Sequence, residues 1–277
     1  MSPPSFTPCA DAAAFRAAIA PWLAADPVPC AGICGVAERI VDGGGWAGVI
    51  HVAGEPRLAL VQTPPRAVLI ASPEPVDAAC VDYAAALFRE RASTVHGVNG
   101  PSPWAEAIAT VLGVTVHARM GLRLHRLVGA PRLPRPVTGQ IRAFHPEEGD
   151  FLWGWHQAFG LEVEPGGHVP LRDPAALERV QREAVAWTVA DKPVSMARMC
   201  RPLLGGWSIA GVYTPPALRG CGYAGAVVHA LSAKLVAEGA SYVALYTDVA
   251  NPISNHLYAR IGFVPCLDLT QITWITP

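Results

Sequence analysis

Apolar positions in the second half of the sequence alternate between two spacings. From Tyr223 to Ala240 they recur every three or four residues, which predicts an amphipathic helix that stops near Gly239. The continuous apolar run Ser241–Thr247 predicts a buried strand, and Pro252–Ile261 returns to helical spacing before Gly262. Further strands are expected at Gln140–Ala143, Pro193–Ala197 and Ser208–Val212, with helical segments at Phe151–Phe159 and from Leu177 into a strand ending at Val189. The order of elements predicts an α/β fold.

A small-residue loop precedes the first of these helices. The run Val212–Ala224 is expected to form a strand end, a turn fixed by Pro215 and Pro216, a loop with Gly220 and Gly222, and a helix start. Free backbone N–H groups and the positive end of a helix dipole then meet in one place, which favours phosphate. The loop has neither the Gly-Lys-Ser/Thr of a Walker loop nor the three glycines of a dinucleotide site.

Two motifs in this region resemble those of the GNAT family of acetyl-CoA-dependent N-acetyltransferases. Arg219-Gly220-Cys221-Gly222-Tyr223-Ala224 is similar to the family's phosphate-binding motif Arg/Gln-x-x-Gly-x-Gly/Ala. The second motif, an Asn followed by a helix with Tyr and then Gly-Phe, corresponds to Asn251–Phe263. The resemblance extends from about Gly139 to the C-terminus.

The resemblance implies a site for acetyl-CoA. The backbone of Val212, Tyr213 and Thr214 would hold the pantetheine arm and polarise the thioester carbonyl. The residues implied for the remaining cofactor contacts are Arg219, Gly220, Cys221, Gly222, Tyr223, Ala224, Asn251 and Ser254. Tyr258 would protonate the departing thiolate as general acid. No metal ligand set is expected.

Each of these residues also has a structural interpretation. Tyr258 lies on an apolar helix face, as many core tyrosines do, and Asn251 has the position of a helix N-cap. For Arg219 we expect a solvated guanidinium, with only the backbone contributing. Glu162 is the preferred general base, and the alternatives are His156, Glu164, Glu183 and Asp248. Any of these five is also compatible with an ordinary surface charge.

The first half repeats some landmarks of the second. Thr63-Pro64-Pro65 ends an apolar run as Thr214-Pro215-Pro216 does, and Asn99-Gly100-Pro101-Ser102 follows at nearly the spacing of Asn251–Ser254. The residues after Pro65 contain no glycine up to Ala71, and no tyrosine lies between Asn99 and Gly113. We therefore expect tandem GNAT-like domains at residues 1–130 and 137–277, the first of which has lost CoA binding.

Composition narrows the functional classes. The chain has 277 residues, 51% of them hydrophobic, and a formal net charge of −1, so a globular protein without a nucleic-acid or membrane-binding basic patch is expected. The odd count of seven cysteines favours reduced thiols in a bacterial cytoplasm, with Cys30 and Cys34 as buried thiols rather than metal ligands. No apolar run suits a membrane span, and the N-terminus lacks signal-peptide character.

The sequence thus predicts an enzyme that moves an acetyl group from acetyl-CoA to a primary amine of a small molecule or peptide. The alternative is a non-catalytic module that binds acyl-CoA as a sensor or scaffold. The acceptor and the oligomeric state stay open.

Overall fold

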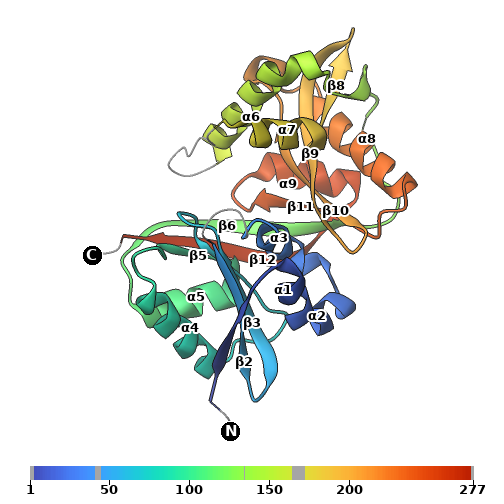
Figure 1. Ribbon diagram of the computed structural model, residues 1–277. Helices are drawn as coiled ribbons and strands as arrows, with labels where there is room; N and C mark the ends of the chain where they lie inside the picture. The colour runs from blue at the N-terminus through green and yellow to red at the C-terminus, as the bar shows by residue number, and fades with distance from the viewer. Residues whose placement is uncertain (1–2, 41–44, 134, 164–171, 276–277) are drawn as a thin grey trace. The chain divides into compact units, whose positions relative to one another are not determined.

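Figure 1 shows a computed structural model that describes residues 3–40, 45–133, 135–163 and 172–275. The chain forms two compact units. The first takes in the chain up to Leu124, the segment Thr247–Asn251 and the residues from Pro265 onward. The second comprises His125–Tyr246 and Pro252–Val264. Neither unit is one continuous stretch of sequence.

The first unit is a mixed sheet with helices packed against it. Its strands follow the order β1-β2-β3-β4-β5-β12-β6, in which the first three pairs are antiparallel and β4–β5 is parallel. The strands are β1 (Ser5–Cys9), β2 (Trp46–Val52), β3 (Glu55–Gln62), β4 (Val68–Ala71), β5 (Gly97–Pro101), β6 (Val116–Leu127) and β12 (Phe263–Trp274). The helices are α1 (Ala12–Ala18), α2 (Ala20–Ala25), η1 (Val28–Cys30), α3 (Ala31–Ala37), α4 (Ala78–Glu90) and α5 (Ser102–Leu112).

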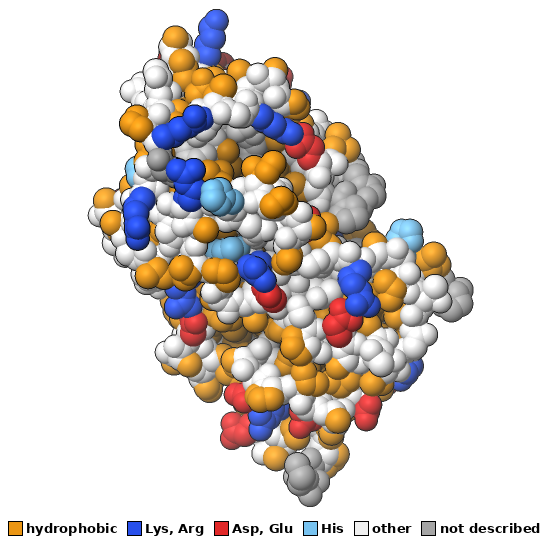
Figure 2. Space-filling model, turned by 180° about the vertical axis from the view of Figure 1, so that it is seen from behind, with side chains coloured by type: hydrophobic (Ala, Val, Ile, Leu, Met, Phe, Trp, Pro, Cys, Tyr) orange, Lys and Arg blue, Asp and Glu red, His pale blue; other side chains and the backbone are white. Residues whose placement is uncertain are grey.

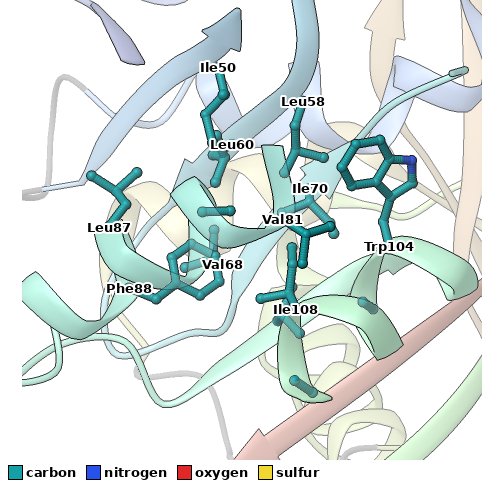
Figure 3. Packing of buried hydrophobic residues seen from close by; sticks show 14 of the residues in the cluster. Ile50, Leu58, Leu60, Val68, Ile70, Val81, Leu87, Phe88, Trp104 and Ile108 are labelled. Atoms are coloured by element: carbon teal, nitrogen blue, oxygen red, sulfur yellow. The ribbon is translucent and has the colours of Figure 1, made fainter. Parts of the chain in front are cut away.

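The core of this unit lies between its strands and helices α4 and α5. Figure 3 shows side chains of β2, β3 and β4, such as Leu60 and Ile70, facing Phe88 of α4 and Trp104 and Ile108 of α5. All five are at most 3% exposed. The amphipathic spacing of α4 and α5 therefore serves a buried interface with the sheet.

The last strand of the chain belongs to this first core. β12 pairs antiparallel with β5 from Leu269↔Pro101 to Thr273↔Gly97. Ile272 and Trp274 enter the core beside α4 and α5. The second unit therefore ends earlier than the domain 137–277 predicted from the sequence, because the apolar side chains of β12 are buried against the first half of the chain.

The second unit contains the order β11-β10-β9-β8-β7. Its strands are β7 (Gln140–Ala143), β8 (Ala184–Val189), β9 (Lys192–Leu203), β10 (Gly206–Tyr213) and β11 (Val243–Asp248). Its helices are η2 (Pro146–Glu148), α6 (Gly149–Val163), α7 (Pro174–Glu183), η3 (Pro216–Leu218), α8 (Tyr223–Ala237) and α9 (Pro252–Ile261). One core joins the strands to α8 and α9, and another joins them to α6 and α7, so the two helix pairs cover opposite faces.

Both halves follow one topology. β7–β8, β8–β9 and β9–β10 are antiparallel and β10–β11 is parallel, which repeats the pairing of β1 to β5. The counterpart of β10 is therefore β4, and not β3. The match between Thr63-Pro64-Pro65 and Thr214-Pro215-Pro216 was wrong, because the former lies in the antiparallel β3–β4 connection. Thr-Pro-Pro marks a strand end in either setting.

The described residues also show the state of the cysteines, the groupings of possible metal ligands and the lengths of the apolar helices. None of the seven cysteines forms a disulfide, and Cys30 and Cys34 are each 2% exposed. Within the described ranges there is no group of three His, Cys, Asp or Glu side chains that could hold a metal, and no helix is long and apolar enough to cross a bilayer. On the face in Figure 2, Lys and Arg side chains occur at several separate places, some beside Asp or Glu.

Candidate active site

The end of β10 is bent by a bulge. The register with β9 shifts between Ala210 and Tyr213, and Gly211 has a φ of +59°, which favours glycine. Buried Ser195 of β9 donates a hydrogen bond to the Tyr213 carbonyl at 3.0 Å and lies 2.9 Å from the Thr214 hydroxyl. Ser195, which the sequence analysis did not single out, thus fixes the strand end that precedes the glycine loop.

The loop after β10 leaves the start of α8 open. Gly220 and Gly222 adopt φ values of +81° and +89°, and Gly222 is an N-cap without a side-chain hydrogen bond. The first backbone bond of the helix is Ala226 N–H to the Gly222 carbonyl at 3.0 Å. Among the described residues, the N–H groups of 220–225 have no acceptor. Unpaired amides at the positive end of a 15-residue helix form a site for an anion.

Arg219 braces the loop with its side chain. Its Nε donates to the Thr214 carbonyl at 2.9 Å, and its Nη2 lies 2.7 Å from both carboxylate oxygens of Glu162. The guanidinium is also 6.0 Å from the centre of the Tyr213 ring. The side chain is exposed, as expected, but its planar fork also binds a carbonyl and a carboxylate, which the sequence did not predict. Glu162, at the end of α6, is joined to the loop by this ion pair.

Tyr258 lies on the face of the sheet that α8 and α9 cover, opposite to the face covered by α6. It is 8% exposed, and its ring meets Phe263 edge-on at 6.1 Å. Burial raises the pKa of its phenol well above the ordinary value, so the hydroxyl stays protonated at neutral pH. Helix α9 approaches the first turn of α8 closely, because a Cβ at Gly225 would lie 3.0 Å from Leu257 Cδ1. Tyr258 shares its apolar core with Val212 and Tyr223.

The other candidate bases have different surroundings. Arg198 Nη1 lies 3.3 Å from His156 Nδ1, and Arg198 Nη2 donates to Glu183 at 2.5 Å. Burial, aided by Arg198 and Arg179, lowers the pKa of His156 to about 4. His156 is therefore neutral at pH 7 and a weak base, and Glu183 is held in an ion pair. Glu164 lies outside the described residues.

Three further residues named from the sequence lie around the start of α9. Asp248 accepts a hydrogen bond from Ala250 N–H at 2.8 Å, and its carbonyl accepts one from Asn251 N–H at 3.1 Å. Asn251 is exposed, whereas Ser254 in the first turn of α9 is half-buried. The turn thus leads directly from β11 into the helix that carries Tyr258.

A pocket opens beside the glycine loop. It has a volume of about 380 Å³ and is lined by Arg135, Pro136, Val137, Thr138, Gly220, Cys221 and Tyr223. Arg135 Nη2 donates to the Gly220 carbonyl at 2.9 Å. Arg135 lies between the two domains predicted from the sequence, 1–130 and 137–277, and no motif marks it.

Comparison with known proteins identifies a family to which this region is similar and solved structures with a similar fold. The model of the acetyltransferase (GNAT) family matches residues 150–263. A GCN5-related N-acetyltransferase from Sphaerobacter thermophilus superposes with a TM-score of 0.66 at 17% identity, covering 98% of this chain and 96% of that one. No curated protein sequence matches the chain.

Two other solved structures show the same fold. A GCN5-related N-acetyltransferase from Kribbella flavida has a TM-score of 0.55 at 19% identity, covering 79% of this chain and 87% of that one. A tandem GNAT protein from the clavulanic acid biosynthesis pathway has a TM-score of 0.54 at 13% identity, covering 99% and 100%. The predicted tandem α/β fold is confirmed.

Proposed function

Because residues 150–263 belong to the acetyltransferase (GNAT) family, we propose that this chain transfers an acetyl group from acetyl-CoA to a primary amine of a small molecule or peptide. The observation that carries the proposal is the open start of α8, where the N–H groups of 220–225 have no acceptor in the described part of the chain. A pyrophosphate supplies the negative charge and the acceptor atoms that these amides lack.

The cofactor contacts follow the order of the chain. The open amides from Gly220 to Ala224 bind the pyrophosphate, whereas the Arg219 N–H already donates to the Pro216 carbonyl at 3.3 Å. The backbone at Val212, Tyr213 and Thr214 binds the pantetheine arm. The bulge at Gly211 and the Ser195 contacts hold this strand end in place before the cofactor arrives. Asn251 and Ser254 contribute from the start of α9. A rigid strand end of this kind can polarise the thioester carbonyl without reorganising.

The acceptor amine must lose its proton before it attacks the thioester carbon. Neutralising a lysine-like amine with a pKa of about 10.4 at pH 7 costs about 4–5 kcal/mol, since one pKa unit is about 1.36 kcal/mol. We assign this proton to Glu162, which is exposed at the end of α6 and reaches the loop through Arg219. The ion pair with Arg219 has to open, or a water has to relay the proton, for the carboxylate to accept it.

Tyr258 completes the reaction on the side of the leaving group. As the amine nitrogen forms its bond to the acetyl carbon, the bond from that carbon to sulfur breaks and Tyr258 protonates the departing thiolate. The nitrogen releases its second proton to solvent as the amide forms, and a proton from solvent restores the Tyr258 phenol. Burial raises the pKa of its phenol, so the group is protonated at neutral pH but is a weaker acid than a solvated tyrosine, and it can protonate only a strongly basic thiolate.

An assay of amine-dependent CoA release tests the proposal. Purified protein is incubated with acetyl-CoA and a panel of amino acids, peptides and small primary amines, and the free thiol is measured. We expect release with at least one acceptor, with a lower rate for Glu162→Gln. Tyr242→Phe, which alters another buried tyrosine of the second unit, is the control. CoA binding without release across the panel would contradict the enzyme and leave a binding module.

A further inference from the structure

The connection between the two halves passes directly beside the glycine loop. Arg135 bonds to the Gly220 carbonyl, and a Cβ at Gly222 would lie 3.1 Å from Arg135 Nη2 and 3.2 Å from Val137 Cγ2. The guanidinium therefore stands at the loop that presents the free amides of α8. It comes from a segment outside both motifs that resemble the family's.

The lining of the pocket fits an anion. Arg135 is its one charged lining residue in the described part of the chain, and no carboxylate lines it. The remaining lining residues carry no charge and are Pro136, Val137, Thr138, Gly220, Cys221 and Tyr223. A cation beside unpaired amides, without a neighbouring acid, is a setting in which phosphate oxygens bind strongly.

We propose that Arg135 binds a phosphate group of CoA, so that the connection between the halves completes the cofactor site. This inference rests on the proposed function. A guanidinium has five N–H donors, and the bond to Gly220 occupies one of them. The others can bind phosphate oxygens while Gly220 stays in place. Arg135 then holds both the loop and the ligand.

The test is a calorimetric titration of Arg135→Gln with CoA at several salt concentrations. Arg132→Gln is the matched control, because Arg132 is an exposed arginine of the same connection that does not line the pocket. We expect Arg135→Gln to weaken CoA binding about tenfold or more, as for a lost charge-assisted hydrogen bond, and to reduce the dependence of affinity on salt. Arg132→Gln should bind as the unaltered protein does.

A second titration with dephospho-CoA identifies the phosphate. An equal loss with CoA and dephospho-CoA assigns Arg135 to the pyrophosphate, and a loss confined to CoA assigns it to the 3′-phosphate. Unchanged affinity for CoA would overturn the inference, as would weaker binding with an unchanged salt dependence, which indicates a brace for Gly220 alone. If the unaltered protein binds no CoA, it is the proposed function that fails.

Discussion

Helices α4 and α8 occupy equivalent places in the two halves, yet their first turns differ in chemistry. Each follows a strand that is parallel to the next strand along the chain, β4 with β5 and β10 with β11. Asp77 caps α4, because its side chain accepts a hydrogen bond from Cys80 N–H at 2.8 Å. Gly222 caps α8 with no side chain at all. One helix start carries its own anion, and the other is open to a ligand.

The segments before these helices reinforce the contrast. Ser72–Asp77 contains two prolines, which have no N–H to offer. Its backbone is also bonded within the unit, since Glu74 N–H donates to the Ser72 hydroxyl and Trp104 Nε1 donates to the Glu74 carbonyl. We infer that the first half cannot bind CoA at this position.

The last helices of the two halves make the same point. Gly113 and Gly262 end α5 and α9, and each N–H donates to the residue four positions earlier at 3.2 Å. Those residues are Ala109 and Tyr258. Two equivalent helix positions thus have different side chains: the methyl group of Ala109 in the first half and the phenol of Tyr258 in the second. Fold alone does not confer the chemistry, which depends on a few side chains placed on it.

The largest expected effect concerns the strand that crosses between the halves. Trp274→Ala should lower the free energy of unfolding of the first unit by about 3–5 kcal/mol, because the buried indole leaves a cavity in that core. Denaturant unfolding measures the loss, and the exposed neighbour in Ile275→Ala is the control. Affinity for CoA should not change. A loss of CoA binding with unaltered stability would contradict the placement of β12 in the first core.

Replacing Gly222 with Asp should give α8 an acidic N-cap like the one that Asp77 provides for α4. Gly222→Asp places a carboxylate at the N-cap beside Arg135, so CoA affinity should fall by about 100-fold, or about 3 kcal/mol. Gly222→Ala has similar backbone strain at φ +89° but no charge, and should lose about tenfold at most. Equal losses in the two variants would show that strain, and not charge, controls the site. Calorimetry reports both affinities.

Tyr258→Phe tests whether the hydroxyl, which the equivalent Ala109 of the first half lacks, takes part in the reaction. Removing the hydroxyl should lower kcat by about 100-fold, as for a lost general acid, with little change in CoA affinity. The ring and its edge contact with Phe263 remain, so the fold should be retained. Steady-state rates and a CoA titration of the same preparation separate the two effects. An unchanged kcat would remove Tyr258 from the mechanism.

Asp77→Ala has the smallest expected effect. Loss of this N-cap should destabilise the first unit by about 1 kcal/mol, and Asp11→Ala, which removes the cap of α1, should cost a similar amount. The number of CoA molecules bound per chain should not rise, because the two prolines of Ser72–Asp77 have no backbone N–H that could bind a phosphate. Thermal or denaturant unfolding and a CoA titration provide the two readings. A second bound CoA would show that the cap alone closes the first half.

The sequence predicted those features that depend on neighbours along the chain. The helix starts at Tyr223 and Pro252, the open glycine loop and the α/β order of strands all follow from local spacing and turn chemistry. Contacts between residues far apart in the sequence could not be predicted in this way. Examples are the hydrogen bond from Arg135 to the Gly220 carbonyl, the contact of Ser195 with Thr214, and the burial of Trp274 in the core of the first unit. A repeated Thr-Pro-Pro was misleading because turn residues recur wherever strands end.

The most direct test of the account is the stoichiometry of acetyl-CoA binding. Calorimetric titration of the full chain should give one acetyl-CoA per chain, because α8 is open and α4 is capped by Asp77. Two molecules per chain would show that the first half also binds the cofactor. No binding at all would contradict the assignment of the glycine loop to CoA.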